Sequence, residues 1–465
     1  MKRFIIWGML IVSAASLALM GFQCSSAEMT SAKLYEQRKE YQNAEAQLLK
    51  ELSKNPKNEE AWYMLGRMRY ELKDMKGAKD AFAEAQKLGT KFRKEAGLAI
   101  LKIWGDLYNK GVEEINNAKE PNDFDKAIET FKLATYVMPE SLMNQQSLGF
   151  AYYRKGDYQS AIEPLTVAFE QGKSETALKI LVGIYMMAAD KAKSAFTEAN
   201  RDAIELKKNL EMVREKIKAA DVKYYIGQPT STKQETKGKG KNAVVVKEEW
   251  TYAPYNMVIT IEGDLVSSVK YTSPFTPNID SSKIFEARAE YNKAIEVLKK
   301  GIAMFPDDQE VSENLMNAYI GSERNVEARA LLDERVKKYP DSKYDHYNLG
   351  VFLLKDEKFE GAVAAFKEVL RIDPEFSSAT YNLAATYVNW GVAEQARLKK
   401  EGKENDKSYQ SKYKEAIPYL EKVTIEKPND VQILELLGQV YANLGEADKA
   451  KAAYDKADAI RQGKN

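Results

Sequence analysis

The sequence has very few of the side chains on which most catalytic centres are built. Its 465 residues include a single histidine, His346, and a single cysteine, Cys24. Zinc sites, thiol chemistry and Ser-His-Asp arrangements each need more imidazoles or thiols than this. We therefore expect no catalytic residue, no metal site and no cofactor. The catalytic class that composition leaves open is an enzyme based on carboxylates.

An excess of charge of either sign is also missing. The 70 lysines and arginines nearly balance the 69 aspartates and glutamates, for a net charge of +1. Proteins that bind nucleic acid usually present a basic field, so we do not expect nucleic acid as a partner. Hydrophobic residues make up 44% of the chain and aromatic residues 10%, which argues against disorder. A chain of this length predicts several domains or an elongated array.

The N-terminal segment MKRFIIWGMLIVSAASLALMGFQCSS combines Lys2 and Arg3 with an apolar run and then Cys24. The apolar run has the length of the hydrophobic region of a signal peptide. The segment resembles a bacterial lipoprotein signal, which implies removal of residues 1–23 and acylation of Cys24. Ordinary secretory cleavage after Ala27 and an uncleaved N-terminal anchor are the alternatives.

All three interpretations place the chain outside the cytoplasm. If Cys24 is acylated, its lipid chains hold the protein at a membrane. Ser25 directly after the cysteine then favours, under enteric-type sorting, the outer membrane facing the periplasm. Without acylation, the protein is secreted or soluble in the periplasm.

Nine alanines recur along the chain, and each is followed four residues later by a large apolar residue. Five of the eight intervals between successive alanines are identical in length. The alanines are Ala44, Ala78, Ala127, Ala161, Ala294, Ala328, Ala362, Ala416 and Ala450. Four residues are about one helical turn, so an alanine and its partner lie on one helix face. The alanine leaves room for a neighbouring helix, and the larger residue fills the adjacent gap.

Prolines and glycines complete the repeated unit. A proline follows many of the alanines by twelve residues and ends the helix, because it cannot continue the hydrogen-bonding pattern; these prolines are Pro56, Pro139, Pro306, Pro340, Pro374 and Pro428. A second amphipathic helix precedes each alanine. Its glycine predicts close contact between the two helices of a unit, at Gly66, Gly149, Gly350 and Gly438.

The units EAWYMLGRMRYELKDMKGAKDAFAEA and YNLGVFLLKDEKFEGAVAAFKEVLRIDP resemble the tetratricopeptide repeat family. The resemblance implies a mainly α-helical protein of about nine stacked helix pairs, wound into a superhelix whose concave face binds extended peptides or partner helices. It implies no catalytic chemistry. We predict an N-terminal array over residues 30–220, containing repeats one to four and the first helix of repeat five, and a C-terminal array over residues 284–462.

Three of the intervals between alanines are longer than the common one and mark insertions. The shorter two insertions, near Tyr108–Asp123 and Val392–Lys412, predict lengthened first helices that end in polar loops. The longest lies between the two arrays and contains the segment EEWTYAPYNMVITIEGDLVSSVKY, residues 248–271. Its alternating apolar residues and its Gly263-Asp264 pair predict a small antiparallel meander, which we place at residues 221–280.

The meander is expected to pack on the preceding helix, in which Leu206, Leu210, Val213 and Ile217 recur at helical spacing. Together the two parts resemble the SmpA/OmlA-type domain of small outer-membrane lipoproteins. The residues that carry this likeness are Gly227, Pro229, Trp250, Tyr252 and Gly263. The motif KGKGK at 237–241 lacks the spacing of a phosphate-binding loop and predicts a hairpin tip.

Three asparagines recur at the same place in consecutive repeats. Asn314, Asn348 and Asn382 are separated by the same interval as the repeat alanines, so the repeat arranges them in a row. Carboxamides both donate and accept hydrogen bonds, and such a row is able to hold the backbone of an extended peptide. Tyrosine suits binding faces, and Tyr344, Tyr347 and Tyr381 flank the row. The alternative is that asparagine is simply frequent at this repeat position.

These patterns predict a non-catalytic scaffold of the bacterial cell envelope that binds other proteins or peptides and supports outer-membrane assembly or secretion. A carbohydrate- or peptidoglycan-associated module that uses the inserted sheet is the main alternative. The regular repeats disfavour a carboxylate-based enzyme such as a glycosidase. The sequence contains no signal for the oligomeric state.

Overall fold

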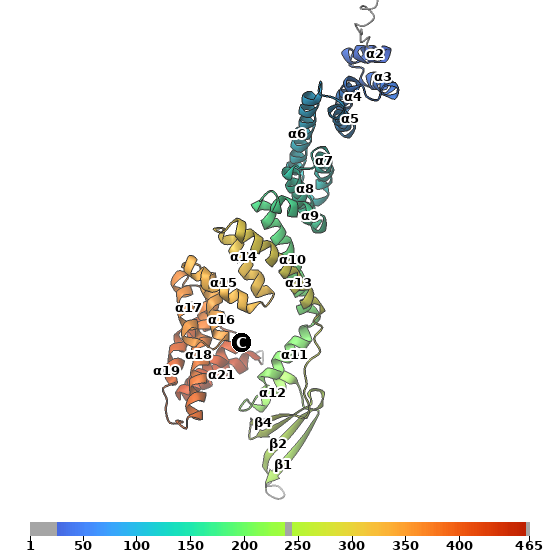
Figure 1. Ribbon diagram of the computed structural model, residues 1–465. Coiled ribbons are helices and arrows are strands. Elements are labelled where there is room, and N and C mark those ends of the chain that lie inside the picture. Colours follow the sequence, from blue (N-terminus) through green and yellow to red (C-terminus); the bar gives the residue numbers. More distant parts are fainter. Residues whose placement is uncertain (1–25, 238–243, 462–465) are drawn as a thin grey trace, which may run out of the picture. The chain divides into compact units, whose positions relative to one another are not determined.

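The computed structural model describes residues 26–237 and 244–461. Cys24 and the predicted signal peptide lie outside the described residues. Within them the chain forms twenty α-helices and one four-stranded antiparallel sheet, shown in Figure 1. This confirms the predicted class, a helical repeat protein with a small inserted meander. Contacts divide the chain into one unit of residues 1–188 and 296–307 and another of residues 189–295 and 308–465. The predicted domain boundaries stay predictions.

Eight helices of the first unit are arranged as consecutive pairs. They are α2 (Ala27–Gln37), α3 (Tyr41–Lys54), α4 (Glu59–Glu71), α5 (Met75–Leu88), α6 (Arg93–Asn117), α7 (Phe124–Val137), α8 (Leu142–Lys155) and α9 (Tyr158–Glu170). Each even-numbered helix packs against the odd-numbered helix that follows it. The first insertion is absorbed as predicted, because α6 is 25 residues long and a short 3-10 turn at Pro121–Asp123 leads into α7.

The second unit continues the same pattern towards the C-terminus. Its helices are α14 (Gln309–Gly321), α15 (Asn325–Lys338), α16 (Lys343–Lys355), α17 (Phe359–Ile372), α18 (Ser377–Lys400), α19 (Gln410–Glu426), α20 (Val431–Leu444) and α21 (Ala447–Arg461). Two further helices, α10 (Glu175–Ala199) and α13 (Ser282–Met304), run through both units. The second predicted helix extension is confirmed by α18, which is 24 residues long.

Small residues on one helix receive bulky residues from the next, as the sequence predicted. Eight of the nine repeat alanines are fully buried, and Ala450 is 6% exposed. A side chain added at Gly350 would lie 2.6 Å from the ring of Phe366, which is the residue four positions after Ala362. The same relation joins Gly66 to Phe82 and Gly438 to Tyr454. These helix pairs are therefore in contact at their glycines, and no larger residue fits there without a shift.

The repeat prolines end helices as predicted. The second helices of six repeats stop two residues before a proline, at Lys54, Val137, Met304, Lys338, Ile372 and Glu426. Many first helices begin with a side-chain cap, which satisfies a backbone N–H of the first turn. The capping residues are Asn58, Ser141, Asp308, Ser342 and Asp430.

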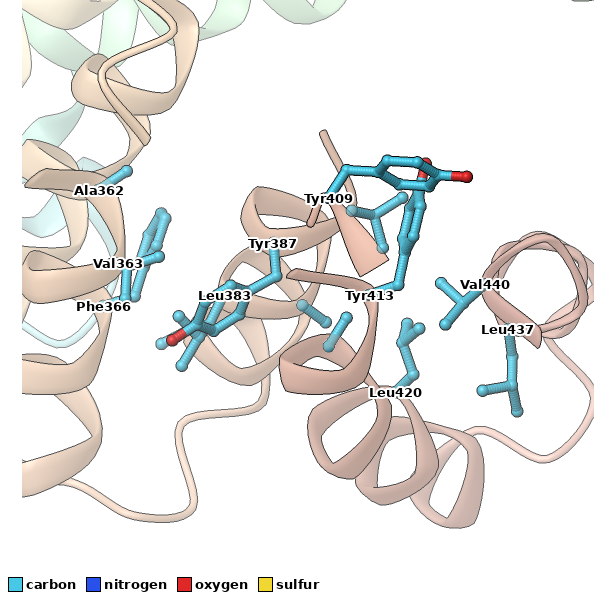
Figure 2. Close-up of a cluster of buried hydrophobic side chains, with 14 of the residues drawn as sticks. Ala362, Val363, Phe366, Leu383, Tyr387, Tyr409, Tyr413, Leu420, Leu437 and Val440 are labelled. Atoms are coloured by element: carbon cyan, nitrogen blue, oxygen red, sulfur yellow. The ribbon is translucent and has the colours of Figure 1, made fainter. Parts of the chain in front are cut away.

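The apolar core runs from repeat to repeat. Figure 2 shows its C-terminal part, in which Phe366 of α17, Leu383 of α18 and Leu420 of α19 belong to one cluster with Leu437 and Val440 of α20. In this part of the array, each helix pair thus buries one side against its neighbour. The stability of such an array comes from contacts between adjacent repeats.

The insertion is a separate small core made of two helices and the sheet. It comprises α11 (Arg201–Met212), α12 (Ala219–Ile226), β1 (Ser231–Lys237), β2 (Val244–Tyr252), β3 (Met257–Glu262) and β4 (Leu265–Tyr271), with strand order β1-β2-β3-β4. Apolar side chains of one sheet face cluster with those of the two helices, including Trp250, Ile259, Val222 and Leu210. Gly263, at φ +63°, stands in the two-residue turn between β3 and β4, as predicted.

The single helix that we predicted through Val213 and Ile217 is wrong. Helix α11 ends at Met212 and α12 begins at Ala219. Between them the backbone follows the start of β4: the amide of Lys216 donates to the carbonyl of Val266, and the amide of Val266 donates to the carbonyl of Ile217. Pairing with the sheet edge replaces the helical hydrogen bonds, and helical spacing of apolar residues does not reveal it.

The meander also departs from strict alternation. A register shift between Thr260 and Ile261 makes Val266 the buried residue of β4, whereas Leu265 is 47% exposed. A second shift in the β1–β2 pairing leaves Val246 without a partner. Such bulges change which face a side chain occupies. The part of the KGKGK motif after Lys237 lies outside the described residues.

Candidate binding surface

The three predicted asparagines lie on the first helices α14, α16 and α18. Each is half-buried, and each stands six positions after the residue that precedes its helix. Within the described residues, no hydrogen bond involves the side chain of Asn314 or Asn348. Their amides are therefore available to a ligand. The repeat alone sets this common position, since the three helices begin in the same register.

Asn382 differs from the other two asparagines, because its side chain already has a partner. Its Nδ2 donates a 3.0 Å hydrogen bond to the hydroxyl oxygen of Tyr347 in the preceding repeat. The ring of Tyr347 lies 5.3 Å from that of Phe376 and 5.9 Å from that of Phe366. Two of the residues that we predicted to bind peptide thus bind each other and join adjacent first helices. Tyr381 is half-buried.

Tyr344 is the most exposed of the predicted aromatic residues, with 54% of its surface accessible. Its ring meets that of Phe376 edge-on at 5.9 Å. The ammonium of Lys343 lies 5.5 Å from the centre of the Phe376 ring and 2.7 Å from the carboxylate of Asp373. This ion pair raises the pKa of Lys343 and lowers that of Asp373. Lys343, Tyr344 and Phe376 form what we term the aromatic platform.

The sequence did indicate that Phe376 is unusual, although the alanine spacing does not involve this residue. Phe376 occupies the repeat position that Ser342 has one repeat earlier and Asp308 two repeats earlier, and both of these residues cap first helices. A large aromatic residue at a capping position gives up the cap, and Phe376 makes no side-chain cap bond. Its ring instead lies against Tyr344 and Tyr347.

A buried ion pair fixes the helix that carries Tyr344 and Tyr347. The guanidinium of Arg335 on α15 makes two bonds to the carboxylate of Asp345 on α16, of 2.8 and 3.0 Å. The two side chains are 2% and 3% exposed. Another N–H of Arg335 donates to the carbonyl of Gln309. The pair therefore connects α14, α15 and α16, which present the first two asparagines.

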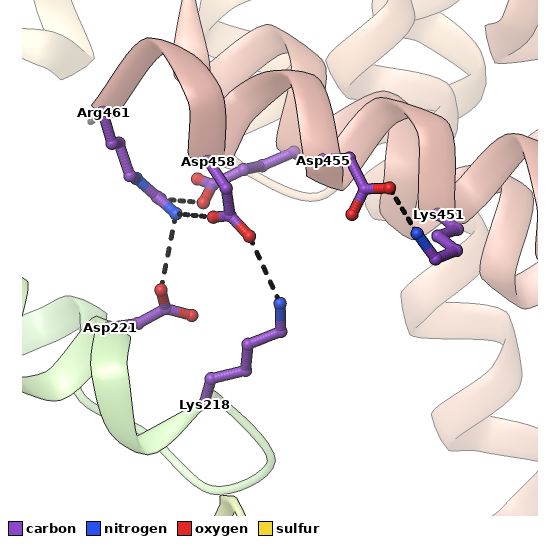
Figure 3. A network of polar contacts seen from close by, with 7 residues as sticks. Lys218, Asp221, Lys451, Asp455, Asp458 and Arg461 are labelled. Atoms are coloured by element: carbon purple, nitrogen blue, oxygen red, sulfur yellow. Dashed lines mark hydrogen bonds and ion pairs between the residues drawn. The ribbon is translucent and has the colours of Figure 1, made fainter. Parts of the chain in front are cut away.

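A cleft lies within the second unit, where the insertion meets the last repeat. Its volume is about 780 Å³, and Ile217, Tyr225, Leu436 and Gln439 are among the residues that line it. Figure 3 shows the polar contacts at this place: Arg461 lies 3.4 Å from Asp221, and Lys218 lies 3.4 Å from Asp458.

Arg461 also forms an ion pair with Glu435. Burial raises the pKa of Asp221 and of Glu435. Sequence reasoning missed the contacts of Arg461 with Asp221 and of Lys218 with Asp458, because each joins residues 240 positions apart along the chain.

The first unit has a smaller cleft of about 290 Å³ beside Arg67, Tyr70 and Lys102. The hydroxyl of Tyr70 donates to Asp106 over 2.5 Å, and Lys102 bonds to both of these residues. These contacts raise the pKa of Lys102. Tyr70, Lys102 and Asp106 thus have hydrogen-bond partners within the protein.

The described part of the chain shows no cluster of histidine, cysteine, aspartate and glutamate able to hold a metal ion. None of its helices combines the length and the apolar character that crossing a membrane requires. The arrangement offers aromatic, amide and charged surfaces suited to recognition.

Comparisons with solved structures find weak likenesses. A crystal structure of MamA protein is 20% identical over 38% of this chain and 86% of its own length, with a TM-score of 0.32. Another MamA structure is 20% identical over 40% of this chain and 98% of its own, with a TM-score of 0.31. These scores are too low to support a functional comparison. A search of curated proteins found no match.

Family models for the tetratricopeptide repeat match several parts of the sequence. The matched residues are 29–91, 287–346, 346–376 and 409–464. They include α14 and α16 with Asn314, Asn348 and the aromatic platform, whereas Asn382 on α18 lies outside them. These stretches of the chain are thus tetratricopeptide repeats, an architecture of stacked helix pairs that presents extended binding surfaces.

Proposed function

We propose that the protein is a non-catalytic scaffold of the bacterial cell envelope. In this proposal, Cys24 is acylated, the repeats face the periplasm, and partner proteins of outer-membrane assembly or secretion bind to the C-terminal repeats. The binding surface consists of Asn314, Asn348 and the aromatic platform. The repeat architecture supports the scaffold, and the lipoprotein-type N-terminus supports the location.

The main observation behind this binding surface is the exposure of Tyr344 beside the side-chain amide of Asn348, which has no hydrogen-bond partner among the described residues. Tyr344 is 54% exposed, and its ring packs edge-on against that of Phe376. Asn348 lies one helical turn further along α16. An aromatic side chain and an amide side by side provide apolar contact and backbone hydrogen bonds to an extended peptide.

Site-specific cross-linking in envelope preparations tests this surface. A photoreactive amino acid replaces Tyr344 in one variant and Val326 in another. Val326 is 80% exposed on α15, which makes it a matched control on a second helix. We expect defined cross-linked partners at position 344 that are absent at position 326. Equal cross-linking at both positions, or none at position 344, would contradict the proposed surface.

The asparagine row is tested separately on a partner that the cross-linking identifies. Asn314→Ala and Asn348→Ala should each weaken binding by about three- to tenfold, since each removes one amide from the contact. Asn382→Ala should act differently, because its amide already bonds Tyr347: we expect lower stability of the array and little direct effect on affinity.

The lipid anchor has its own test. Labelled fatty acid should enter the wild-type protein and not the Cys24→Ser variant. Incorporation into both chains, or into neither, would remove the anchor from the proposal and leave the repeat surface unaffected.

A further inference from the structure

Strand β1 forms an open edge of the inserted sheet. All seven residues from Ser231 to Lys237 are exposed, and β2 is the one described strand that pairs with β1. Figure 1 shows β1 at the opposite side of the sheet from β4. The start of β4 is covered by the segment around Lys216. The extra residue of the β1–β2 bulge belongs to β2, so β1 itself stays regular and able to accept another strand.

The charged residues next to Gln234 in β1 have opposite signs. Lys233 and Glu235 stand on either side of Gln234. If a second copy of β1 is placed antiparallel with the two Gln234 residues opposite each other, each Lys233 faces Glu235 of the other copy. Thr232 then faces Thr236. Opposite charges directly across an antiparallel pair stabilise it, and like charges destabilise it.

The neighbouring strand extends this complementarity. Within one chain, Lys233 stands opposite Glu249 and Glu235 stands opposite Lys247. These four residues share one sheet face, because Thr232 pairs with the buried Trp250 on the other. In the dimer, a row of four side chains would cross both copies. It would contain Glu249 and Lys233 of one copy, followed by Glu235 and Lys247 of the other. The charges alternate through all four positions, on the face away from the buried core.

We propose that β1 pairs with β1 of a second copy of this chain, giving a two-fold dimer centred on Gln234. The partner is this chain itself because the edge is self-complementary in charge, the usual form of a two-fold interface. Lysines on an edge strand commonly protect it from pairing. Protection does not require the lysine–glutamate symmetry about Gln234, whereas pairing between two copies does.

A disulfide trap tests the register in the full-length chain solubilised in detergent. Gln234→Cys is combined with Cys24→Ser, so that the new cysteine is the sole one. Directly opposite residues have Cα atoms about 5 Å apart, within reach of a disulfide. Lys237→Cys is the matched control, because two copies of residue 237 would lie roughly 20 Å apart in this register. We expect disulfide dimers at position 234 and at least about tenfold fewer at position 237.

Charge exchange tests the chemistry. Lys233→Glu and Glu235→Lys each place like charges at both two-fold-related positions, and each should raise the dimer dissociation constant by about tenfold. The double variant restores opposite charges between the two copies but places like charges across β1 and β2 within each chain, so it should restore dimerisation in part. A mixture of the two single variants should form a mixed dimer. All seven β1 residues are exposed, so helical content by circular dichroism should stay unchanged in every variant.

Two results would overturn the proposal. One is a wild-type chain that sediments as a monomer at about 100 µM, well above the dissociation constants of typical specific pairs; the lysines would then act as edge protection. The other is a dimer whose dissociation constant ignores the charge exchanges and whose position 234 is not trapped, which would place the interface elsewhere.

Discussion

Asn200 and Asp280 lie 80 residues apart in the sequence and are joined by two hydrogen bonds. The amide of Asn200 donates to the carbonyl of Asp280 over 3.0 Å, and the backbone N–H of Asp280 donates to Asn200 Oδ1 over 2.8 Å. The side chain of Asn200 is almost completely buried. The insertion therefore leaves the repeat array and returns to it at one point.

Because the two ends of the insertion are in contact, we predict that the insertion can be deleted without unfolding the repeats. Deleting residues 201–279 and joining Asn200 to Asp280 through two glycines should leave the repeats folded, because chain ends that already touch need little closure entropy. A deletion of residues 222–275 alone should aggregate, since it leaves Leu206 and Leu210 of α11 without the sheet that covers them. Circular dichroism and sedimentation distinguish the two outcomes.

The same deletion separates the scaffold from its main alternative. If the inserted sheet is a carbohydrate-binding element, pull-down with peptidoglycan should be lost together with residues 201–279. If the repeats carry the function, cross-linking at Tyr344 should persist in the shortened chain.

The contact between Gly350 and Phe366 predicts a strong effect of one methyl group. Gly350→Ala places a Cβ 2.6 Å from the Phe366 ring and should lower the free energy of unfolding by about 1–3 kcal/mol. Gly105→Ala is the control: apart from the surrounding backbone of its own helix, no atom of the described residues lies within 4 Å of the added Cβ. The change should raise stability by about 0.5–1 kcal/mol through helix propensity. Urea denaturation measures both. Similar destabilisation by both variants would contradict the contact.

The buried pair of Arg335 and Asp345 should be costly to break from one side. Asp345→Ala leaves a guanidinium buried without its partner, and we expect a loss of about 3–5 kcal/mol in the free energy of unfolding. Arg371 and Asp341 form an exposed pair, 58% and 82% accessible, so Asp341→Ala should cost less than about 1 kcal/mol. Chemical denaturation of the two variants decides the comparison. Equal effects would mean that burial of the first pair has no energetic consequence.

Buried tyrosines predict loss of stability at alkaline pH. Burial raises the pKa of Tyr252 and of Tyr413 to about 12, whereas tyrosine in an unfolded chain titrates near pH 10. Between these values the unfolded state loses protons that the folded state keeps. The contribution of these two tyrosines to the free energy of unfolding is therefore fully present below about pH 10 and decreases as pH rises towards 12. Circular dichroism recorded as a function of pH should show the chain unfolding within this range.

Removing the two hydroxyl groups should have opposite consequences. The hydroxyl of Tyr252 donates to the carbonyl of Gly227 over 3.1 Å, so Tyr252→Phe should cost about 1 kcal/mol. The hydroxyl of Tyr413 is buried and has no hydrogen-bond partner among the described residues. Tyr413→Phe should be neutral or stabilising, because it removes a buried polar group that nothing satisfies. Thermal unfolding of both variants tests the difference.

Much of this structure was predicted from the spacing of residues close together in the sequence. Helical pairs, their glycine contacts and their proline ends follow from spacing along the chain, because each depends on residues within one repeat. The length of α6 and α18 was equally readable, since an insertion of helical residues extends the helix that contains it. The β3–β4 turn at Gly263 was readable because two residues between alternating strands define a hairpin.

The candidate site was less accessible to such reasoning. The asparagine spacing predicted three amides in one register, but it did not show that the side chain of Asn382 is hydrogen-bonded to Tyr347. That bond depends on how closely adjacent first helices approach, and the approach depends on side chains such as Phe376 that the repeat pattern does not contain. The break between α11 and α12 was not predicted for a similar reason. The backbone there is hydrogen-bonded to β4, which lies some fifty residues further along the chain.

What the sequence determined by itself is the repeated unit: alanine, glycine and proline act through steric contact within a few turns of helix, so their positions are sufficient. What only the tertiary structure decided is which polar groups meet. Arg335 with Asp345, Arg461 with Asp221 and Asn200 with Asp280 are pairs between segments that the folded chain brings together. Hydrogen bonds and ion pairs act over about 3 Å, and a one-dimensional pattern does not specify distances on that scale between distant residues.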